Sequence, residues 1–360
     1  MQDFARIQSW LRERFPRHPN IYFGVSGTSL LYEALKFESR TLIIFPAFIC
    51  PSLPAMALRA GKSVVHLDAD PLTLHPKATA LETCLAHHDA SNCTVLIDHS
   101  FGYPFPGLAC LRTRFPGLLI VEDCARALGV SIHGRFPGEH SDWVLLSMYK
   151  TITGPRNGAV LLTKTPLPLQ EHPNVPVTIR ERAATIGPLR FFYDLAQRGR
   201  RGFLPPPRGL KSPDWTPQYG FPSSLCMARF AAELDRFETR SVARNSIAGE
   251  LVEKLSGIEG LECIRTAEGC QPAGNFVSFK MRNREDRDRT LSLLQRNGLF
   301  LSRTWNLLPL NYEILAETFL DGHAGSRELW DRIAHIPVRL FLSETRRRRL
   351  IQALNLRSGL

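Results

Sequence analysis

Three short segments of the sequence carry residue types that could together hold and activate a ligand. Val25–Ser29 reads Val-Ser-Gly-Thr-Ser before an apolar helical segment, so its hydroxyls and free N–H groups could bind an anion at the helix start. Glu122 and Asp123 follow an apolar strand directly, where a carboxylate can reach a ligand beyond the sheet edge. Lys150 follows another such strand, and a lysine amine can act as a nucleophile or a base.

Each segment also has a simpler interpretation. Ser-Gly-Thr before a helix is more often only a helix cap. A satisfied polar role in a loop is about as probable for the two acids as a functional one. A lone lysine after a strand is usually solvated, but apolar residues precede Lys150, and Gly154 and Gly158 follow it.

Pyridoxal phosphate (PLP) needs a lysine for a Schiff base, an acid facing its pyridine nitrogen, donors around its phosphate and a flat or apolar contact for its ring. The sequence offers a candidate for each of these requirements. PLP is therefore the cofactor that we expect. We expect no metal, because the eight scattered cysteines form no CxxC pair.

Alternating strands and helices up to about residue 165 predict the element order that would position these residues. The expected strands are Thr41–Phe45, Ser63–Leu67, Thr94–Ile97, Leu118–Val121, Trp143–Leu146 and Ala159–Leu162. The expected helices between them are Leu30–Phe37, Leu53–Arg59, Ala78–His87 and Leu108–Arg114. This order favours an α/β fold with a doubly wound, mostly parallel sheet, whose ligand lies at the carboxyl ends of the strands.

The chain divides on this pattern into a large α/β domain, residues 1–220, and a small α+β domain, residues 221–360. Residues 165–216 are rich in proline and arginine and form an irregular insertion, with one helix at Leu189–Gln197. The long helical block Ser223–Leu255 opens the second domain. A strand at Phe276–Met281, a helix at Asp286–Arg296, a strand near Leu301–Thr304 and a helix at Thr345–Leu354 follow.

Consecutive sequence blocks resemble the DegT/DnrJ/StrS family of sugar aminotransferases, which have the aspartate-aminotransferase fold (PLP-dependent fold type I). The blocks are VSGTSLLYEAL (25–35), FPAFICPSLPAMALRAGKSVVHLDAD (45–70), DHSFGYP (98–104), VEDCARALGVSIHG (121–134) and SMYKTITGPRNGAVL (147–161), and SSLCMARFAAELDRFETR (223–240) follows them. The resemblance covers roughly residues 20 to 255.

The resemblance implies a role for each matching position. Lys150 would carry PLP as a Schiff base and move a proton, and Asp123 would pair with the pyridinium nitrogen. Gly27, Thr28 and Ser29 would hold the phosphate, with help from Ser147.

Several positions depart from the family pattern. Cys50 stands where an aromatic residue commonly stacks on the ring, and Arg126 stands where a glutamine commonly meets the ring oxygen. Tyr219 replaces an asparagine that reaches the phosphate of the partner subunit, and Asn157 replaces a glycine. An Arg126 near the ring oxygen would favour its anionic form, but a side chain turned toward solvent or an acid is equally compatible with the sequence.

The composition of the chain indicates which partners and which cellular compartment to expect. The net charge of +11 suits an anionic partner, with many arginines in 180–211 and in the run Arg346–Arg349. The second run has a simpler interpretation as the exposed turn of a helix. No nucleic-acid-binding motif is present, and the longest uncharged run, Thr41–Leu58, holds three prolines and does not suit a membrane span. We therefore expect a cytoplasmic protein.

The first functional hypothesis is transfer of an amino group from an amino acid, glutamate above all, to a keto group on a phosphorylated or nucleotide-linked sugar. The family resemblance also implies a homodimer. A second hypothesis keeps PLP and changes the reaction or the carbonyl substrate. A third is a non-enzymatic scaffold with a basic surface, which would have no physical need to retain Asp123, Lys150 and the phosphate turn together.

Overall fold

A seven-stranded sheet organises the N-terminal part of the protein. The computed structural model describes residues 2–150, 157–178, 182, 215–302, 308–320 and 322–356. The strands in spatial order are β1 (Asn20–Gly24), β8 (Ala159–Thr163), β7 (Trp143–Ser147), β5 (Leu119–Asp123), β4 (Cys93–Asp98), β2 (Leu42–Pro46) and β3 (Ser63–Leu67). Neighbouring pairs from β7 to β3 are parallel, whereas β8 is antiparallel to both β7 and β1.

Helices cover both faces of this sheet, because successive side chains of each strand point to opposite faces. Leu145 of β7 packs with α2 (Gly27–Phe37) and α3 (Ser52–Arg59). Its neighbours Val144 and Leu146 pack with α1 (Gln2–Arg14) and α8 (Ser224–Leu234) on the other face. Helices α4 (Ala78–Ala86) and α5 (Leu108–Arg114) share a core with β4 on that second face. The expected doubly wound, mostly parallel sheet is thereby confirmed.

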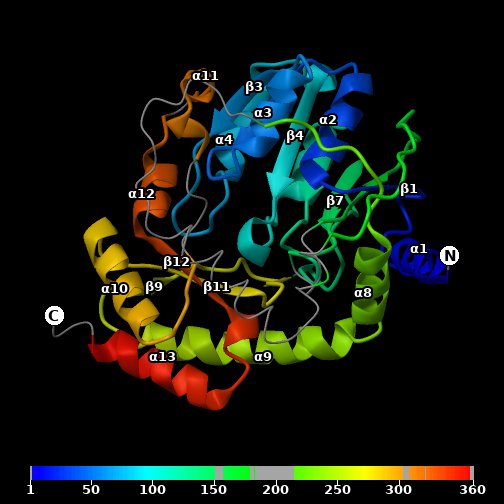
Figure 1. Cartoon of the computed structure of the whole chain (residues 1–360). Coiled ribbons are helices and arrows are strands. Elements are labelled where there is room, and N and C mark those ends of the chain that lie inside the picture. The colour runs from blue at the N-terminus through cyan, green and yellow to red at the C-terminus, as the bar shows by residue number, and fades with distance from the viewer. Residues whose placement is uncertain are drawn as a thin grey trace.

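A three-stranded antiparallel sheet organises the C-terminal part, below the large sheet in Figure 1. Its strands, in order, are β12 (Ile333–Pro337), β11 (Phe276–Lys280) and β9 (Glu262–Cys263). Helices α9 (Phe237–Ser256), α10 (Arg284–Arg296) and α13 (Glu344–Leu356) share a hydrophobic core with it. Two short strands, β6 (Ser131–Ile132) and β10 (Cys270–Gln271), pair across the two parts. The shorter helices are α11 (Glu313–Ala316) and α12 (Ala324–Arg332).

The expected elements agree with this structure, with some exceptions. The six expected strands of the large sheet are present to within two residues at each end, but β1, β12 and the two-residue strands β6, β9 and β10 were not predicted. The helical block from Ser223 is two helices, α8 and α9, separated at Asp235 and Arg236. The expected helix Leu189–Gln197, most of the insertion and the end of the segment expected as a strand near Leu301–Thr304 lie outside the described residues. The described part of that last segment forms only an isolated bridge between Ser302 and His335. The proposed division at residues 220 and 221 remains a prediction.

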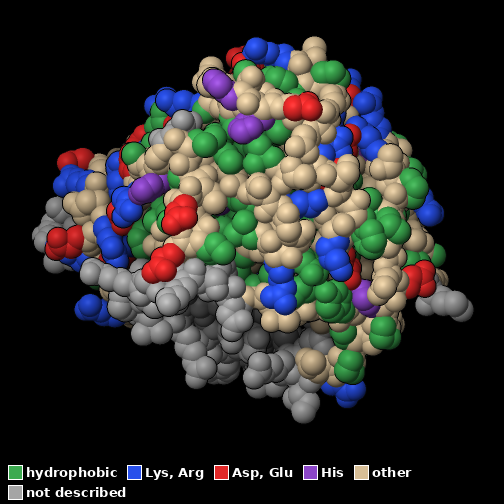
Figure 2. Space-filling view, turned by 90° about the horizontal axis from the view of Figure 1, so that it is seen from above, with side chains coloured by type: hydrophobic (Ala, Val, Ile, Leu, Met, Phe, Trp, Pro, Cys, Tyr) green, Lys and Arg blue, Asp and Glu red, His purple; other side chains and the backbone are tan. Residues whose placement is uncertain are grey.

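The arginine run Arg346–Arg349 makes contacts within the protein. Arg347 Nε lies 2.9 Å from Glu250 Oε2 of α9, and Arg348 pairs with Glu344 one turn earlier. Arg346 and Arg349 donate to the carbonyls of Gly298 and Asn297. On the face shown in Figure 2, Lys and Arg side chains are dispersed among acidic and apolar ones. The contacts of Arg346–Arg349 within the protein fit the simpler interpretation of this run, as the exposed turn of a helix.

No helix within the described ranges is both long enough and apolar enough to cross a membrane.

Asp68 joins the end of β3 to the start of α12. Its carboxylate accepts hydrogen bonds from Gly325 N at 2.7 Å, Ser326 N at 2.8 Å and Ser326 Oγ at 2.7 Å. The N–H groups at a helix start have no partner within the helix, so Asp68 caps α12 from a distant element.

We expect Asp68→Ala to lower the free energy of unfolding by about 1–2 kcal/mol, the usual cost of losing a helix cap. Urea unfolding followed by circular dichroism measures this change. Glu253→Gln, at an exposed position of α9, is the control and should leave the midpoint unchanged. Equal midpoints for Asp68→Ala and wild type would show that this cap contributes nothing to stability.

Candidate active site

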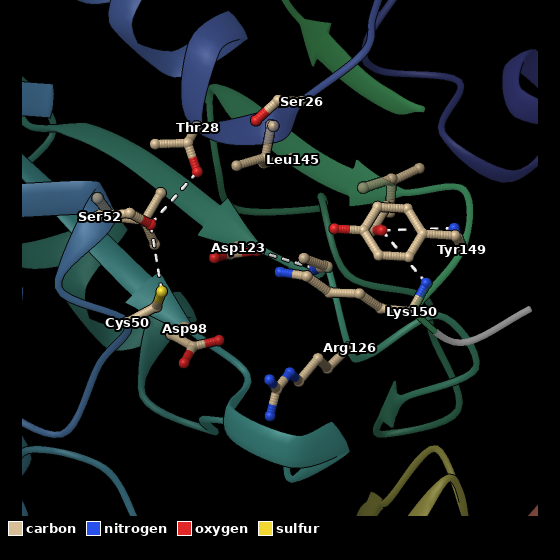
Figure 3. Close-up of a pocket in the computed structure, with 15 residues that line it drawn as sticks. Ser26, Thr28, Cys50, Ser52, Asp98, Asp123, Arg126, Leu145, Tyr149 and Lys150 are labelled. Carbon is tan, nitrogen blue, oxygen red and sulfur yellow. Dashed lines mark hydrogen bonds between the residues drawn. The ribbon is translucent and has the colours of Figure 1, made fainter. Parts of the chain in front are cut away.

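A pocket at the carboxyl ends of the parallel strands gathers most of the residues singled out from the sequence. Its lining comprises Ser26, Gly27, Thr28, Cys50, Ser52, Leu53, Asp98, Asp123, Ala125, Arg126, Leu145, Leu146, Ser147, Tyr149 and Lys150. Figure 3 shows these side chains arranged around one hollow. Parallel strands end at one edge of the sheet, so residues far apart in sequence meet there.

The start of α2 forms one wall of the pocket and suits a phosphate. Ser26 has an extended backbone, its side chain makes no capping bond, and the first turn of α2 holds no acidic residue. The positive end of the helix therefore faces the pocket without a side-chain partner for its first N–H groups. A Cβ at Gly27 would meet Leu145 at 3.3 Å, so glycine lets this turn lie against β7.

Hydroxyl and thiol groups continue this wall. Thr28 Oγ1 lies 3.4 Å from Ser52 Oγ, which lies 3.2 Å from Cys50 Sγ. Ser29, in contrast, does not line the pocket: it is buried, and its hydroxyl accepts a hydrogen bond of 2.8 Å from Gln218 N. Ser29 therefore ties α2 to the segment before α8 instead of facing a ligand.

Asp123 ends β5 and is buried in the pocket wall. Its Oδ1 accepts a hydrogen bond of 2.8 Å from Ala125 N, which fixes the carboxylate at the sheet edge. One carboxylate oxygen is held in this way, and the group as a whole lines the pocket. A cation or N–H donor of a ligand could pair with it there.

Lys150 lies in the turn after β7, in the same pocket lining. Ser147 Oγ accepts from Lys150 N at 3.3 Å and from Tyr149 N at 3.4 Å, so the serine shapes the turn that presents the lysine. Figure 3 shows the Lys150 side chain directed into the pocket. Lys164 and Lys62 lie outside the lining: Lys164 Nζ is 3.6 Å from Asp142 Oδ1, and Lys62 donates to the carbonyl of Glu38.

The positions that depart from the family pattern have separate surroundings. Arg126 lies over the ring of Phe101, with its guanidinium carbon 4.4 Å from the ring centroid, and lines the pocket. Cys50 lines the pocket as well. Tyr219 lies outside the lining, half exposed, with its ring 5.2 Å from that of His172.

Asp98, Ser52 and Tyr149 line the pocket but were not among the predicted site residues. Asp98 ends β4 directly opposite Asp123 in the strand register. The signal that could have found it is the one that found Asp123, a carboxylate directly after an apolar strand.

A buried acid–histidine pair lies next to the two pocket acids in the sequence: Glu122 precedes Asp123 on β5, and His99 follows Asp98 after β4. His99 Nδ1 accepts from Phe105 N at 3.1 Å, so a neutral His99 carries its proton on Nε2 and donates to Glu122 Oε2 at 2.8 Å. Gly138 N donates to Glu122 Oε1 at 2.8 Å. Burial acts to raise the pKa of Glu122, but hydrogen bonds, above all from His99, outweigh it and lower that pKa. With Cys124 these side chains form a group within metal-binding reach, but the hydrogen bonds already occupy the ligand atoms of the acid and the histidine.

Comparison with known proteins matches the region that builds this pocket. The model of the DegT/DnrJ/EryC1/StrS aminotransferase family matches residues 23–167. A curated relative, UDP-N-acetyl-3-dehydro-alpha-D-glucosamine 3-aminotransferase of Acidithiobacillus ferrooxidans, is 25% identical over 144 residues, which are 39% of this chain and 38% of that protein. That alignment thus reaches well under half of the relative.

Solved structures resemble the chain over nearly its whole length. A DegT DnrJ EryC1 StrS aminotransferase from Brucella abortus has a TM-score of 0.73 at 17% identity, over 98% of this chain and 90% of that one. A protein of Streptococcus pneumoniae in its PMP form (pyridoxamine phosphate) has a TM-score of 0.73 at 14% identity, over 99% and 92% of the two chains. The chain therefore has the fold of PLP-dependent aminotransferases, and its residues 23–167, which supply the whole pocket lining, resemble the DegT/DnrJ/EryC1/StrS aminotransferase family.

Proposed function

We propose that the protein is a PLP-dependent aminotransferase that transfers an amino group from an amino acid, glutamate above all, to a keto group of a nucleotide-linked sugar. The observation that carries this proposal is the meeting of Lys150, Asp123 and the uncapped start of α2 in one pocket. These groups meet the main requirements of PLP: an amine, an acid and a phosphate site.

The donor set of the pocket fits this cofactor. The N–H groups at the start of α2, with the hydroxyls of Thr28 and Ser147, would hold the phosphate. Asp123 would pair with the pyridinium nitrogen, and Lys150 would supply the amine that anchors the cofactor covalently. PLP itself, once bound, acts as the electron sink for the carbon that gains or loses the amino group. The PMP form of the S. pneumoniae protein, which shares the fold, is consistent with this assignment.

The residues of this chain have separable tasks in the reaction. The Lys150 amine would take the proton from the substrate carbon and return it at the cofactor, because it lies at the end of a side chain directed into the pocket. Asp123 would keep the ring nitrogen protonated through a charge-assisted hydrogen bond. Cys50 would lie beside the cofactor where a ring-stacking residue is commonly found, and a sulfur side chain can make an apolar contact there.

The substrate class rests on the curated relative, whose name gives a UDP-linked keto sugar as its substrate. A phosphorylated sugar also suits the positive net charge of +11. We further propose a homodimer in the cytoplasm, as is usual for the family. A monomer at micromolar concentration that binds PLP and turns over would contradict the dimer.

Absorbance spectroscopy tests the proposed function. The purified protein loaded with PLP should lose the PLP spectrum and gain that of PMP when L-glutamate is added, and the 3-keto form of UDP-N-acetylglucosamine should restore it. If glutamate converts PLP to PMP but that sugar does not restore PLP, the protein would still be an aminotransferase, and the proposed sugar substrate would be wrong. A PLP spectrum that no amino acid in a panel changes would instead support the second hypothesis, a PLP enzyme of another reaction type. A protein that does not bind PLP would support the third hypothesis, a non-enzymatic scaffold.

A further inference from the structure

Asp98 is a second carboxylate in the pocket, next to Asp123. The two residues are register partners at the ends of β4 and β5, and both line the pocket. Asp98 is only 7% exposed, and Ser100 Oγ donates a hydrogen bond of 2.6 Å to its Oδ2. Each of the two carboxylates thus accepts a hydrogen bond from the residue two positions later in the chain.

Ionising the Asp98 carboxyl group in this buried position is energetically unfavourable. Burial and the neighbouring charge of Asp123 raise the pKa of Asp98 to about 7, against the opposing effects of Ser100, Arg126 and Lys150. A neutral side chain of similar size would fit the same place without desolvating a charge. Polar residues that cost stability are concentrated at functional sites, so Asp98 has the character of a site residue.

Arg126 is a cation that lines the same pocket as Asp98. Residues other than Asp98 hold Arg126 in place. Its guanidinium lies over Phe101, with Phe276 also nearby at 5.9 Å, and Asn275 donates to its backbone carbonyl at 3.4 Å. Burial lowers the pKa of Arg126, and the charge of Asp98 acts most strongly against that effect. Figure 3 shows Asp98 and Arg126 on the same side of the pocket.

We propose that Asp98 is the counter-charge of Arg126, and that this pair sets the electrostatic potential that the bound cofactor experiences. The proposal rests on the proposed function, because it assumes that PLP occupies the pocket. Asp98 acts in this scheme through the electrostatic field that it adds to those of Arg126 and Asp123, and not by holding Arg126 in place. Arg126 would retain its place without Asp98, because the Phe101 ring supports its guanidinium.

The test is a pH titration of the absorbance of bound PLP in wild type, Asp98→Asn and Arg126→Gln. Removing a negative charge makes it easier for the bound cofactor to lose a proton. Asp98→Asn should therefore lower the midpoint of this titration, the pH at which half of the bound cofactor has lost that proton, by about one pH unit. Arg126→Gln removes a positive charge and should raise the midpoint. The double variant should return toward the wild-type value, because it lacks both charges.

The controls separate this proposal from the proposed function. Asp89→Asn, a fully exposed carboxylate before β4, should leave the midpoint unchanged. A wild-type protein that takes up no PLP would overturn the proposed function and the role of Asp98 with it. A wild-type protein that binds PLP, with an unchanged midpoint in Asp98→Asn or a shift in the direction of Arg126→Gln, would overturn the role of Asp98 alone.

The stability of the cofactor-free protein provides an independent readout. The pKa of Asp98 is about 7 in the folded state and about 4 when unfolded, so the stability gained from its protonated form is lost as pH rises between these values. Asp123, Arg126 and Lys150 face it and are retained in the variant. The urea midpoint of Asp98→Asn should therefore match wild type near pH 4 and exceed it at pH 8. A lower midpoint at pH 8 would mean that the charged Asp98 stabilises the fold, and would contradict the argument that this carboxylate is kept at a cost to stability.

Discussion

Lys150→Ala is expected to abolish amino transfer while some PLP still binds. The proposed role of this lysine combines covalent anchoring with proton transfer, and a positioned base alone contributes about 10²–10⁴-fold to a rate. The start of α2 and Asp123 do not depend on Lys150 and would keep a noncovalent hold on the cofactor. Steady-state assays with glutamate as donor, and PLP binding followed by fluorescence, measure the two effects separately.

Two further variants define what Lys150 contributes. Lys150→Arg keeps the charge but offers no nucleophilic amine, so it should be equally inactive. Lys164→Ala removes a lysine that pairs with Asp142 outside the pocket, and it should retain near-normal activity. Borohydride reduction of the wild-type protein with PLP should label Lys150. Label on another lysine, or turnover by Lys150→Ala, would show that the assignment is wrong.

Asp123→Asn is expected to reduce turnover by roughly 10²–10³-fold, because truncating one partner of a buried charge pair typically costs 2–5 kcal/mol. An asparagine oxygen can still accept the bond from Ala125 N, so the loop after β5 should keep its shape. The unfolding midpoint should therefore stay close to wild type while turnover falls. The loss should appear mainly in kcat, because the pyridinium charge matters most when electrons flow into the ring.

A different outcome for Asp123→Asn would redirect the search for the acid. Full activity would mean that another carboxylate faces the ring nitrogen, and Asp98 is the other acid in the described pocket lining. Parallel measurements on Asp98→Asn decide between the two, because only the ring partner should lower kcat strongly.

The large sheet could be predicted from sequence because its strands are short apolar runs between turn residues. Strands such as Leu119–Asp123 and Ala159–Thr163 are buried along their whole length, which favours continuous apolar runs such as Leu118–Val121 and Ala159–Leu162. β1 could not be predicted in the same way: it is only partly buried at four of its five positions and forms through its antiparallel pairing with β8. β12 carries His335 in its centre, and its pairing with the distant β11 is not visible in local sequence.

The site could be predicted to the extent that local sequence encodes it. Lys150, Asp123 and Thr28 each follow a strand or begin a helix, and the sheet brings such positions together. Ser29 was predicted to face the cofactor, but the helical turn directs its hydroxyl to Gln218 instead. The stacking of Arg126 on Phe101 depends on segments that meet only in the folded chain, so the sequence left its direction open.

Phe101 serves two parts of the molecule at once. One neighbour of its ring is Arg126 in the pocket, and the other is His335 of β12, whose ring lies stacked at 3.6 Å. His335 Nδ1 is in turn hydrogen-bonded to Ser278 Oγ of β11 at 2.8 Å. The Phe101 backbone has a left-handed φ of 54°, a conformation that costs a non-glycine residue roughly 1–2 kcal/mol. Because the Phe101 ring contacts both Arg126 and His335, a movement of β11 and β12 relative to the large sheet would either shift Arg126 as well or separate these contacts. The position of the Arg126 charge in the pocket is therefore coupled to the position of β11 and β12.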